Sequence, residues 1–133
     1  MVAGLSIIVP SFRSVSIIDL CLRAIDAELK NSSHYYEILV IDSSPQPPLL
    51  PQLSNLILYH SNTKLFASEA RNIGARIAKY PTLVFIDADV IILPEAIQKL
   101  VNELQTGVDG VGGVYETDNS KTSIISTYQD LFL

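Results

Sequence analysis

The chain has 133 residues, of which 48% are hydrophobic and 17% are charged, and its formal net charge at pH 7 is −5. These values indicate one globular domain with a substantial core, and they exclude a disordered chain or two domains of ordinary size. No two basic residues are adjacent, so the chain lacks the basic patch that binding to a nucleic-acid backbone needs. We therefore expect no nucleic-acid partner.

The single cysteine and the amino-terminal sequence indicate a cytoplasmic protein. Cys21 cannot form an internal disulfide, as is usual in a reducing compartment, and its helical apolar surroundings favour a core residue over a nucleophile. Met1 is followed by a strand-like sequence rather than by a basic leader and a cleavable apolar segment. No apolar run approaches the roughly 20 residues that span a bilayer, so we expect membrane association only within a longer parent protein.

The first elements along the chain are a strand and an amphipathic helix. Residues 5–9 predict a buried strand that Pro10 ends. Ser16, with Asp19 three residues later, resembles a capping box at the start of a helix that residues 31–33 end. The apolar residues of this helix recur at spacings of three and four, which predicts its core face: Ile18, Cys21, Leu22, Ile25 and Leu29.

The next segments predict two further strands. Residues 37–41 form the second strand, with Asp42 at its carboxyl end, and complete a right-handed β-α-β unit with parallel strands. Four prolines in residues 43–51 exclude a regular helix and favour a stiff, extended surface connection over a ligand for another domain. Residues 56–59 predict a short third strand.

A second helix is expected to begin at Ser68. Asn72 and Gly74 are poor helix formers, and their position early in this helix predicts close packing or a ligand nearby. Four residues are expected to face the core: Ala70, Ile73, Ile77 and Ala78.

The third part of the chain is organised around residues 82–86, which predict a buried central strand followed by Asp87 and Asp89. Pro94 at a first helical position predicts a helix that extends through residue 104. Gly107 is a plausible end of this helix, residues 111–115 suggest a weak fifth strand, and residues 120–133 have roughly helical apolar spacing.

These predictions bring polar residues to one edge of one sheet, because parallel strands end on the same side. Phe12, Asp42 and Asp87 each lie at or just after the carboxyl end of a predicted strand. If the third and second strands lie on one side of the first and the fourth on the other, a crevice opens between the first and fourth strands. Open α/β sheets bind their ligands in such a crevice.

Asp87 and Asp89 predict a metal-assisted site for a phosphorylated substrate. Carboxylate oxygens suit Mg²⁺ or Mn²⁺, and these ions usually arrive with a phosphate. Phe12 can stack on a base, Asp42 can accept a hydrogen bond from a base or ribose, and Arg71 adds a cation at a helix start. No glycine-rich phosphate loop is present, so a metal would have to neutralise a diphosphate. The simpler alternative is that the two acids only solvate the end of a strand.

On these residues the sequence resembles the family 2 glycosyltransferases of the GT-A fold. The resemblance rests on four motifs in matching order and spacing: residues 5–12 (LSIIVPSF), 37–44 (EILVIDSS), 69–74 (EARNIG) and 84–90 (VFIDADV), with Leu93, Pro94 and Glu95 after them. It implies an α/β fold, a Rossmann-like three-layer sandwich with a mostly parallel sheet. It also implies sugar transfer from a UDP- or GDP-sugar donor to an acceptor that the sequence does not identify.

The resemblance further implies roles for seven residues. Pro10, Ser11 and Phe12 line the base pocket, Asp42 binds the base, Arg71 lies near it, Asp87 contacts the ribose, and Asp89 ligates Mn²⁺ or Mg²⁺.

The chain departs from the family pattern at three places that bear on pocket shape and nucleotide preference. Residues 42–45, Asp-Ser-Ser-Pro, replace two acids and a Gly-Ser turn. Residues 64–66, Lys-Leu-Phe, stand where a glycine is usual, and the proline-rich connection replaces a polar one.

Family members also carry an acceptor site and an acidic catalytic base, which residues 1–133 are expected to lack. We therefore expect these residues to be the nucleotide-diphospho-sugar-binding part of a glycosyltransferase domain, with the catalytic base unknown and a homodimer or partner-chain contact through the carboxyl-terminal apolar segment. The acids left as candidate bases are each expected to be solvated surface charges: Asp109, Glu116, Asp118 and Asp130.

Two other functions fit parts of the sequence. One is a non-catalytic module that binds a nucleotide-sugar. The other is a haloacid-dehalogenase-like phosphatase, in which Asp87 would attack phosphate and Asp89 would be the general acid. That family carries the motif on its first strand and needs a later lysine and a second acidic pair, whereas here the motif follows the fourth predicted strand.

Overall fold

The computed structural model describes residues 4–114, and the chain divides into two compact units, Met1–Ile97 and Gln98–Leu133. The first unit contains a four-stranded, fully parallel sheet in the order β3-β2-β1-β4. Its strands are β1 (Gly4–Ser11), β2 (Tyr35–Asp42), β3 (Leu56–His60) and β4 (Thr82–Phe85). This is the order under which the sequence predicts a crevice between the first and fourth strands.

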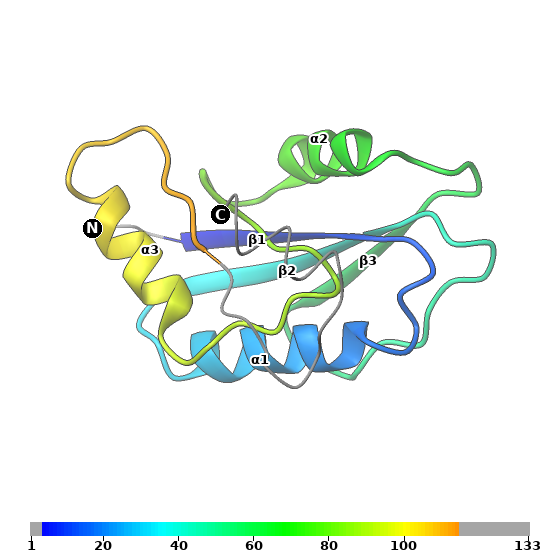
Figure 1. Cartoon of the computed structure of the whole chain (residues 1–133), viewed down its shortest axis with the longest axis horizontal. Helices are drawn as coiled ribbons and strands as arrows, with labels where there is room; N and C mark the ends of the chain where they lie inside the picture. The colour runs from blue at the N-terminus through cyan, green and yellow to red at the C-terminus, as the bar shows by residue number, and fades with distance from the viewer. Residues whose placement is uncertain (1–3, 115–133) are drawn as a thin grey trace. The chain divides into compact units, whose positions relative to one another are not determined.

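Helices α1 (Ile18–Lys30) and α2 (Ala67–Ile77) cover opposite faces of the sheet, as Figure 1 shows. The reason is the right-handedness of crossovers between parallel strands. Helix α1 lies in the connection from β1 to β2, and α2 lies in the connection from β3 back past β2 and β1 to β4. These two connections cross the sheet in opposite directions, so right-handed crossovers place their helices on opposite faces. The result is the predicted three-layer α/β sandwich.

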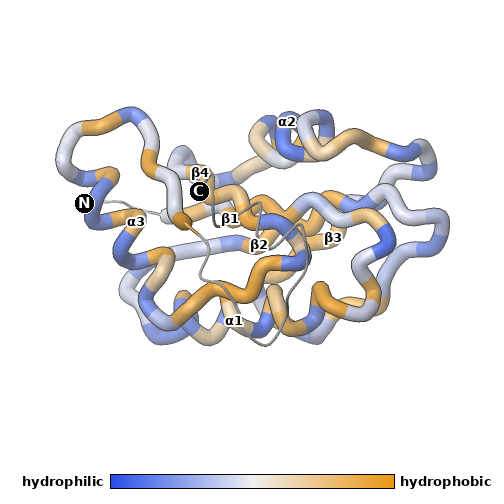
Figure 2. Tube along the Cα trace, viewed as in Figure 1, coloured by the Kyte–Doolittle hydropathy of each residue, from blue (hydrophilic) through white to orange (hydrophobic). Residues whose placement is uncertain are grey.

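Helix α1 buries the five residues that its periodicity predicts. The predicted capping box is wrong, because the residue before the helix is Ile17 and no side chain caps it. The backbone N–H groups of Ile17 and Ile18 donate instead to the carbonyl of Ser14, and Asp19 pairs with Arg23 one turn later at 2.8 Å. Figure 2 shows hydrophilic and hydrophobic residues alternating along the turns of both helices, as expected for helices with one face on a sheet.

Strand β1 continues through Pro10 to Ser11, two residues beyond its predicted end. The carbonyl of Ile8 accepts a hydrogen bond from the N–H of Ile86, on the β4 side. Backbone groups alternate between the two sides of a strand, so the nitrogen of Pro10, two residues later, also faces the β4 side. The pairing with β4 ends at Ile8, so the missing N–H of Pro10 interrupts no ladder. The pairing with β2 continues, with Ser11 opposite Asp42.

The predicted central strand is wrong in its position, because β4 lies at an edge of the sheet and β1 is flanked on both sides. Among residues 4–114, no strand pairs with the outer side of β4, and Phe85 is 46% exposed. Ile86 and Ala88, which follow the strand, are buried.

Helix α2 packs on β1 and β2 through Ala70 and Gly74, its two buried residues. A Cβ atom at Gly74 would lie 2.5 Å from Cγ2 of Ile8, so this glycine allows a close approach of helix and sheet, as predicted. The prediction that Ile77 faces the core is wrong, because its side chain is 46% exposed at the end of the helix.

Helix α3 (Ala96–Leu104) begins after Pro94 rather than at it. Glu95 has a φ of 67°, which is left-handed and interrupts the predicted first turn. Gly107, with a φ of 97°, follows the end of the helix as expected. Residues 111–114 form no strand, and the rest of the predicted fifth strand and residues 120–133 lie outside the described residues. None of the helices formed by residues 4–114 has the length and apolarity needed to cross a membrane.

Candidate functional site

Asp42 is the last residue of β2, and its carboxylate is fully buried at the carboxyl edge of the sheet. Oδ1 accepts hydrogen bonds from the hydroxyl groups of Ser11 at 2.9 Å and Ser44 at 2.7 Å. Oδ2 accepts one from the backbone N–H of Ser44 at 3.0 Å and lies 2.9 Å from Nδ1 of His60. A carboxylate offers about four acceptor positions, so these contacts occupy all of its capacity.

The contacts of Asp42 join the ends of three strands and the loops that follow them. Ser11 ends β1, and its hydroxyl also contacts that of Ser14, just before α1. Ser44 is the second residue of the proline-rich crossover, and its hydroxyl also accepts a hydrogen bond from the backbone N–H of Arg13. His60 ends β3, and the N–H of the next residue donates to the carbonyl of Asp42. One buried negative charge thus holds this part of the sheet edge together.

Phe12 lies directly after β1 and leaves 37% of its surface exposed. Two cations from different loops lie near its ring: Nζ of Lys64 is 4.7 Å from the ring centroid and Cζ of Arg13 is 5.4 Å from it. Both distances are within the range of cation–π attraction. Phe12 therefore presents a partly exposed aromatic ring beside positive charge.

Arg71, in α2, pairs with Asp87, just after β4, with 2.8 Å between Nη2 and Oδ1. The side chains are 38% and 45% exposed, so solvent screens this pair. The backbone carbonyl of Asp87 also accepts a weak hydrogen bond from the buried thiol of Cys21 at 3.6 Å. Burial, and then the negative charges of Asp89 and Asp87, raises the pKa of this thiol to about 12. Cys21 is therefore a protonated core residue, as the sequence predicts.

Asp89 is exposed, and its carboxylate forms no hydrogen bond or ion pair with the part of the chain that the structure describes. Within residues 4–114, no three side chains of His, Cys, Asp or Glu are grouped closely enough to hold a metal ion. Mg²⁺ usually binds proteins through one or two carboxylates together with substrate phosphates. Asp89 therefore fits a divalent cation that a phosphorylated ligand would share, because residues 4–114 add no group of ligands to it.

The structure joins the predicted site residues into separate groups. Ser11 and Asp42 are hydrogen-bonded, and Arg71 is paired with Asp87. Pro10 lies within β1, and Asp109 is exposed in the second unit. The other candidate bases, Glu116, Asp118 and Asp130, lie outside the described residues.

Sequence reasoning gave no role at this edge to Ser44 or Lys64 and no partner to His60. The parallel register could have indicated His60, because this register pairs the last residues of β2 and β3 directly.

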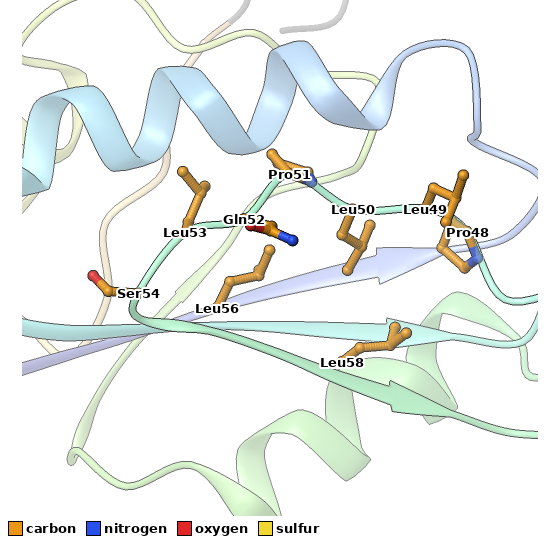
Figure 3. Close-up of a pocket in the computed structure, with 9 residues that line it drawn as sticks. All are labelled: Pro48, Leu49, Leu50, Pro51, Gln52, Leu53, Ser54, Leu56 and Leu58. Atoms are coloured by element: carbon orange, nitrogen blue, oxygen red, sulfur yellow. The ribbon is translucent and has the colours of Figure 1, made fainter.

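A groove of about 630 Å³ lies elsewhere, between the proline-rich crossover and β3, and Figure 3 shows its lining. Seven of its nine lining residues are leucine or proline and none is charged: Pro48, Leu49, Leu50, Pro51, Gln52, Leu53, Ser54, Leu56 and Leu58. It contains none of the predicted site residues. Its apolar walls do not suit a diphosphate.

Residues 6–131 match the model of glycosyl transferase family 2, and the chain belongs to this family. It is 30% identical over 103 residues to an uncharacterized glycosyltransferase of Haemophilus influenzae, covering 76% of this chain and 34% of that protein. It is 31% identical over 109 residues to a hyaluronan synthase of Pasteurella multocida, covering 76% of this chain and 11% of the synthase. The chain thus spans about a third or less of the length of these relatives.

Similar solved structures include residues 1–349 of Staphylococcus aureus TarS, with a TM-score of 0.61 and 18% identity over 87% of this chain and 40% of that one. The same part of TarS in complex with UDP-GlcNAc gives a TM-score of 0.62, again at 18% identity, over 87% of this chain and 38% of that one. These likenesses confirm the predicted fold class, α/β and GT-A-like. The family match leaves the phosphatase alternative without support.

Proposed function

We propose that this chain binds the nucleotide-diphospho-sugar donor of a glycosyltransferase, with a UDP- or GDP-sugar as ligand. The observation that carries the proposal is the shared edge at which β1, β2 and β4 end, with Phe12, Asp42 and Asp87 at or just after their last residues. This edge includes the point where the strand order reverses, between β1 and β4, which is where open α/β sheets bind nucleotides. The similarity to TarS, solved with UDP-GlcNAc, supports the same ligand class.

In this proposal Pro10, Ser11 and Phe12 line the base pocket, with the base stacked on Phe12. Asp42 lies at the base, and Arg71 orients Asp87 toward the ribose through their ion pair. Because the four contacts of Asp42 use its acceptor capacity, a base could bond to this carboxylate only by replacing one of them. We infer that Asp42 shapes the pocket mainly by fixing its loops.

Asp89 would hold Mn²⁺ or Mg²⁺ together with the diphosphate. A bound divalent cation supplies Lewis-acid stabilisation of the charge on the departing nucleoside diphosphate. Within residues 4–114 the carboxylate of Asp89 has no hydrogen-bond or ion-pair partner, as this role needs, whereas the carboxylate of Asp87 is already paired with Arg71. The remaining requirement of an inverting transfer is a carboxylate that removes the proton of the acceptor hydroxyl. We propose no residue for this role.

Calorimetry on the 133-residue chain tests this proposal. We expect UDP or GDP to bind with Mn²⁺ or Mg²⁺ present and to lose affinity in EDTA. Asp89→Asn should remove most of the metal dependence, whereas Asp19→Asn, an exposed surface acid, should leave it unchanged. Equal affinity with and without metal would contradict the role of Asp89.

The aromatic contact is tested separately. Stacking of a base on an aromatic ring contributes about 1–3 kcal/mol, so Phe12→Ala should weaken nucleoside binding about tenfold or more with or without metal. Tyr35→Ala is the matched control, because Tyr35 is an exposed aromatic residue at the opposite end of β2. If both variants bind alike, the base does not stack on Phe12.

A non-catalytic nucleotide-sugar-binding module is the second candidate. The observation that favours it is that, within residues 4–114, the candidate base is Asp109, which is exposed. Donor binding without turnover in any larger assembly that contains this chain would favour the module, whereas transfer to an acceptor in such an assembly would favour the enzyme.

A further inference from the structure

The ring of Phe12 lies near two cations, and neither of them forms an ion pair within residues 4–114. Lys64 lies in the loop between β3 and α2, and Arg13 lies in the loop between β1 and α1. Their charged groups lie 4.7 Å and 5.4 Å from the ring centroid. Two loops that are far apart in the sequence thus bring positive charge to one aromatic ring.

The backbone around both cations is fixed by the segment that follows Asp42. The N–H of Leu65, next to Lys64, donates to the hydroxyl of Ser43 at 2.9 Å. The N–H of Arg13 donates to the hydroxyl of Ser44 at 2.8 Å, and Arg13 has a φ of 53°, in the left-handed region that non-glycine residues rarely adopt. Both loops are therefore held beside Phe12 by specific contacts.

The acids of the site do not neutralise these cations. Asp42 is surrounded by its four hydrogen-bond contacts, and Asp87 is paired with Arg71. A cation on a partly exposed aromatic ring is weakly held. A charge-assisted bond to phosphate is stronger, so an anionic ligand can draw the ammonium group away from the ring.

We propose that Lys64 is a phosphate-contacting residue of the nucleotide site, and that its ammonium group leaves the ring of Phe12 when a base stacks there. This inference rests on the proposed function, because it takes a nucleoside diphosphate as the ligand. It gives Lys64 two opposing effects. The ammonium group competes with the base for the aromatic ring, and it attracts the phosphates.

The experiment compares Lys64→Met with the unaltered chain by calorimetry, using UDP and GDP and their uncharged nucleosides, with and without Mg²⁺. We expect the variant to bind the diphosphate about tenfold more weakly, as the loss of one charged contact implies. We expect nucleoside affinity to be unchanged or higher. The dependence of diphosphate affinity on NaCl concentration should also become weaker, because one screened attraction is lost.

Two control variants sharpen the comparison. Lys79→Met removes a lysine whose Nζ lies 5.3 Å from the ring centroid of Tyr80, a similar contact away from Phe12, and should change neither affinity. Lys64→Arg keeps the charge and should retain most of the diphosphate affinity.

The outcomes separate the two proposals. If the unaltered chain binds neither UDP nor GDP, the proposed function fails and this inference fails with it. If it binds them and Lys64→Met binds them equally well, only the role of Lys64 is overturned. Equal weakening of nucleoside and diphosphate binding would also overturn the phosphate contact, because it would assign Lys64 to the base.

Discussion

Gly74 shows how one missing side chain sets the distance between a helix and a sheet. In an exposed helix, alanine is more favourable than glycine by about 1 kcal/mol. At this position, however, a Cβ would lie 2.5 Å from Cγ2 of Ile8, a β-branched residue buried in the central strand. The branch of Ile8 cannot turn aside in a packed core.

We therefore predict that Gly74→Ala lowers the free energy of unfolding by about 1–3 kcal/mol, which is the usual cost of overpacking. Urea unfolding measures this change. Gly110→Ala is the control, because nothing lies within 4 Å of the added Cβ. In an Ile8→Ala background Gly74→Ala should cost less, and equal costs in both backgrounds would show that the contact with Ile8 is not the cause.

The buried thiol of Cys21 should make the free energy of unfolding depend on pH. Its pKa is raised to about 12 in the folded chain, whereas an unfolded cysteine ionises near about 8.5. Between these values the unfolded chain releases the thiol proton and the folded chain keeps it, so the free energy of unfolding falls as pH rises. The fall approaches at most about 1.4 kcal/mol per pH unit.

Urea unfolding of the unaltered chain and of Cys21→Ala at pH 8, 9 and 10 isolates this effect from other groups that titrate. We expect the stability difference between the two chains to shift steadily in favour of the variant as pH rises. A difference that stays constant over this range would show that the buried thiol ionises normally.

At the scale of secondary-structure elements, the buried carboxylate of Asp42 links the ends of three strands. Its partners come from β1, from the start of the crossover after β2, and from β3. Buried donors that lose their acceptor cost free energy because they are no longer solvated. The ordering of the loops that carry Phe12, Arg13 and Lys64 depends on this arrangement.

We predict that Asp42→Asn lowers the free energy of unfolding by about 1–3 kcal/mol, because an amide replaces two acceptor positions with donors that face other donors. Nucleotide affinity should fall as well. The matched control is Asp19→Asn, whose carboxylate pairs with Arg23 on the surface of α1 and whose loss should cost at most about 0.5 kcal/mol. Similar small costs for both variants would contradict the structural role of Asp42.

At the scale of the whole molecule, the chain belongs to glycosyl transferase family 2 and spans about a third or less of the length of its Haemophilus and Pasteurella relatives. Sugar transfer needs a positioned acceptor and a group that takes its proton. A positioned base typically contributes about 10²–10⁴-fold to a rate. Among the described residues the candidate base is Asp109, which is exposed.

We therefore predict that residues 1–133 alone bind the donor without transferring its sugar. Product analysis with a labelled nucleotide-sugar and a panel of acceptors measures this directly, with slow donor hydrolysis as the background reaction. Robust glycosylation that is abolished by substitution of Glu116, Asp118 or Asp130 would contradict the prediction and would identify the base.

The sequence by itself determined the fold class and the family. The core face of α1 follows from apolar periodicity, which is local, and the parallel pairing of β1 with β2 follows from the β-α-β order and its right-handed crossover. The four motifs at the strand ends were sufficient to indicate the family because they depend on residue identity and spacing alone.

Only the tertiary structure decided which strand is central and what each site residue contacts. The run of residues 82–86 is apolar enough for a central strand, yet β4 lies at the edge because pairing depends on how distant segments assemble. The contacts between Asp42 and His60 and between Phe12 and Lys64 likewise join residues from separate loops. Residues so far apart in the sequence form no periodic pattern that would predict their contact, so only the folded chain shows it.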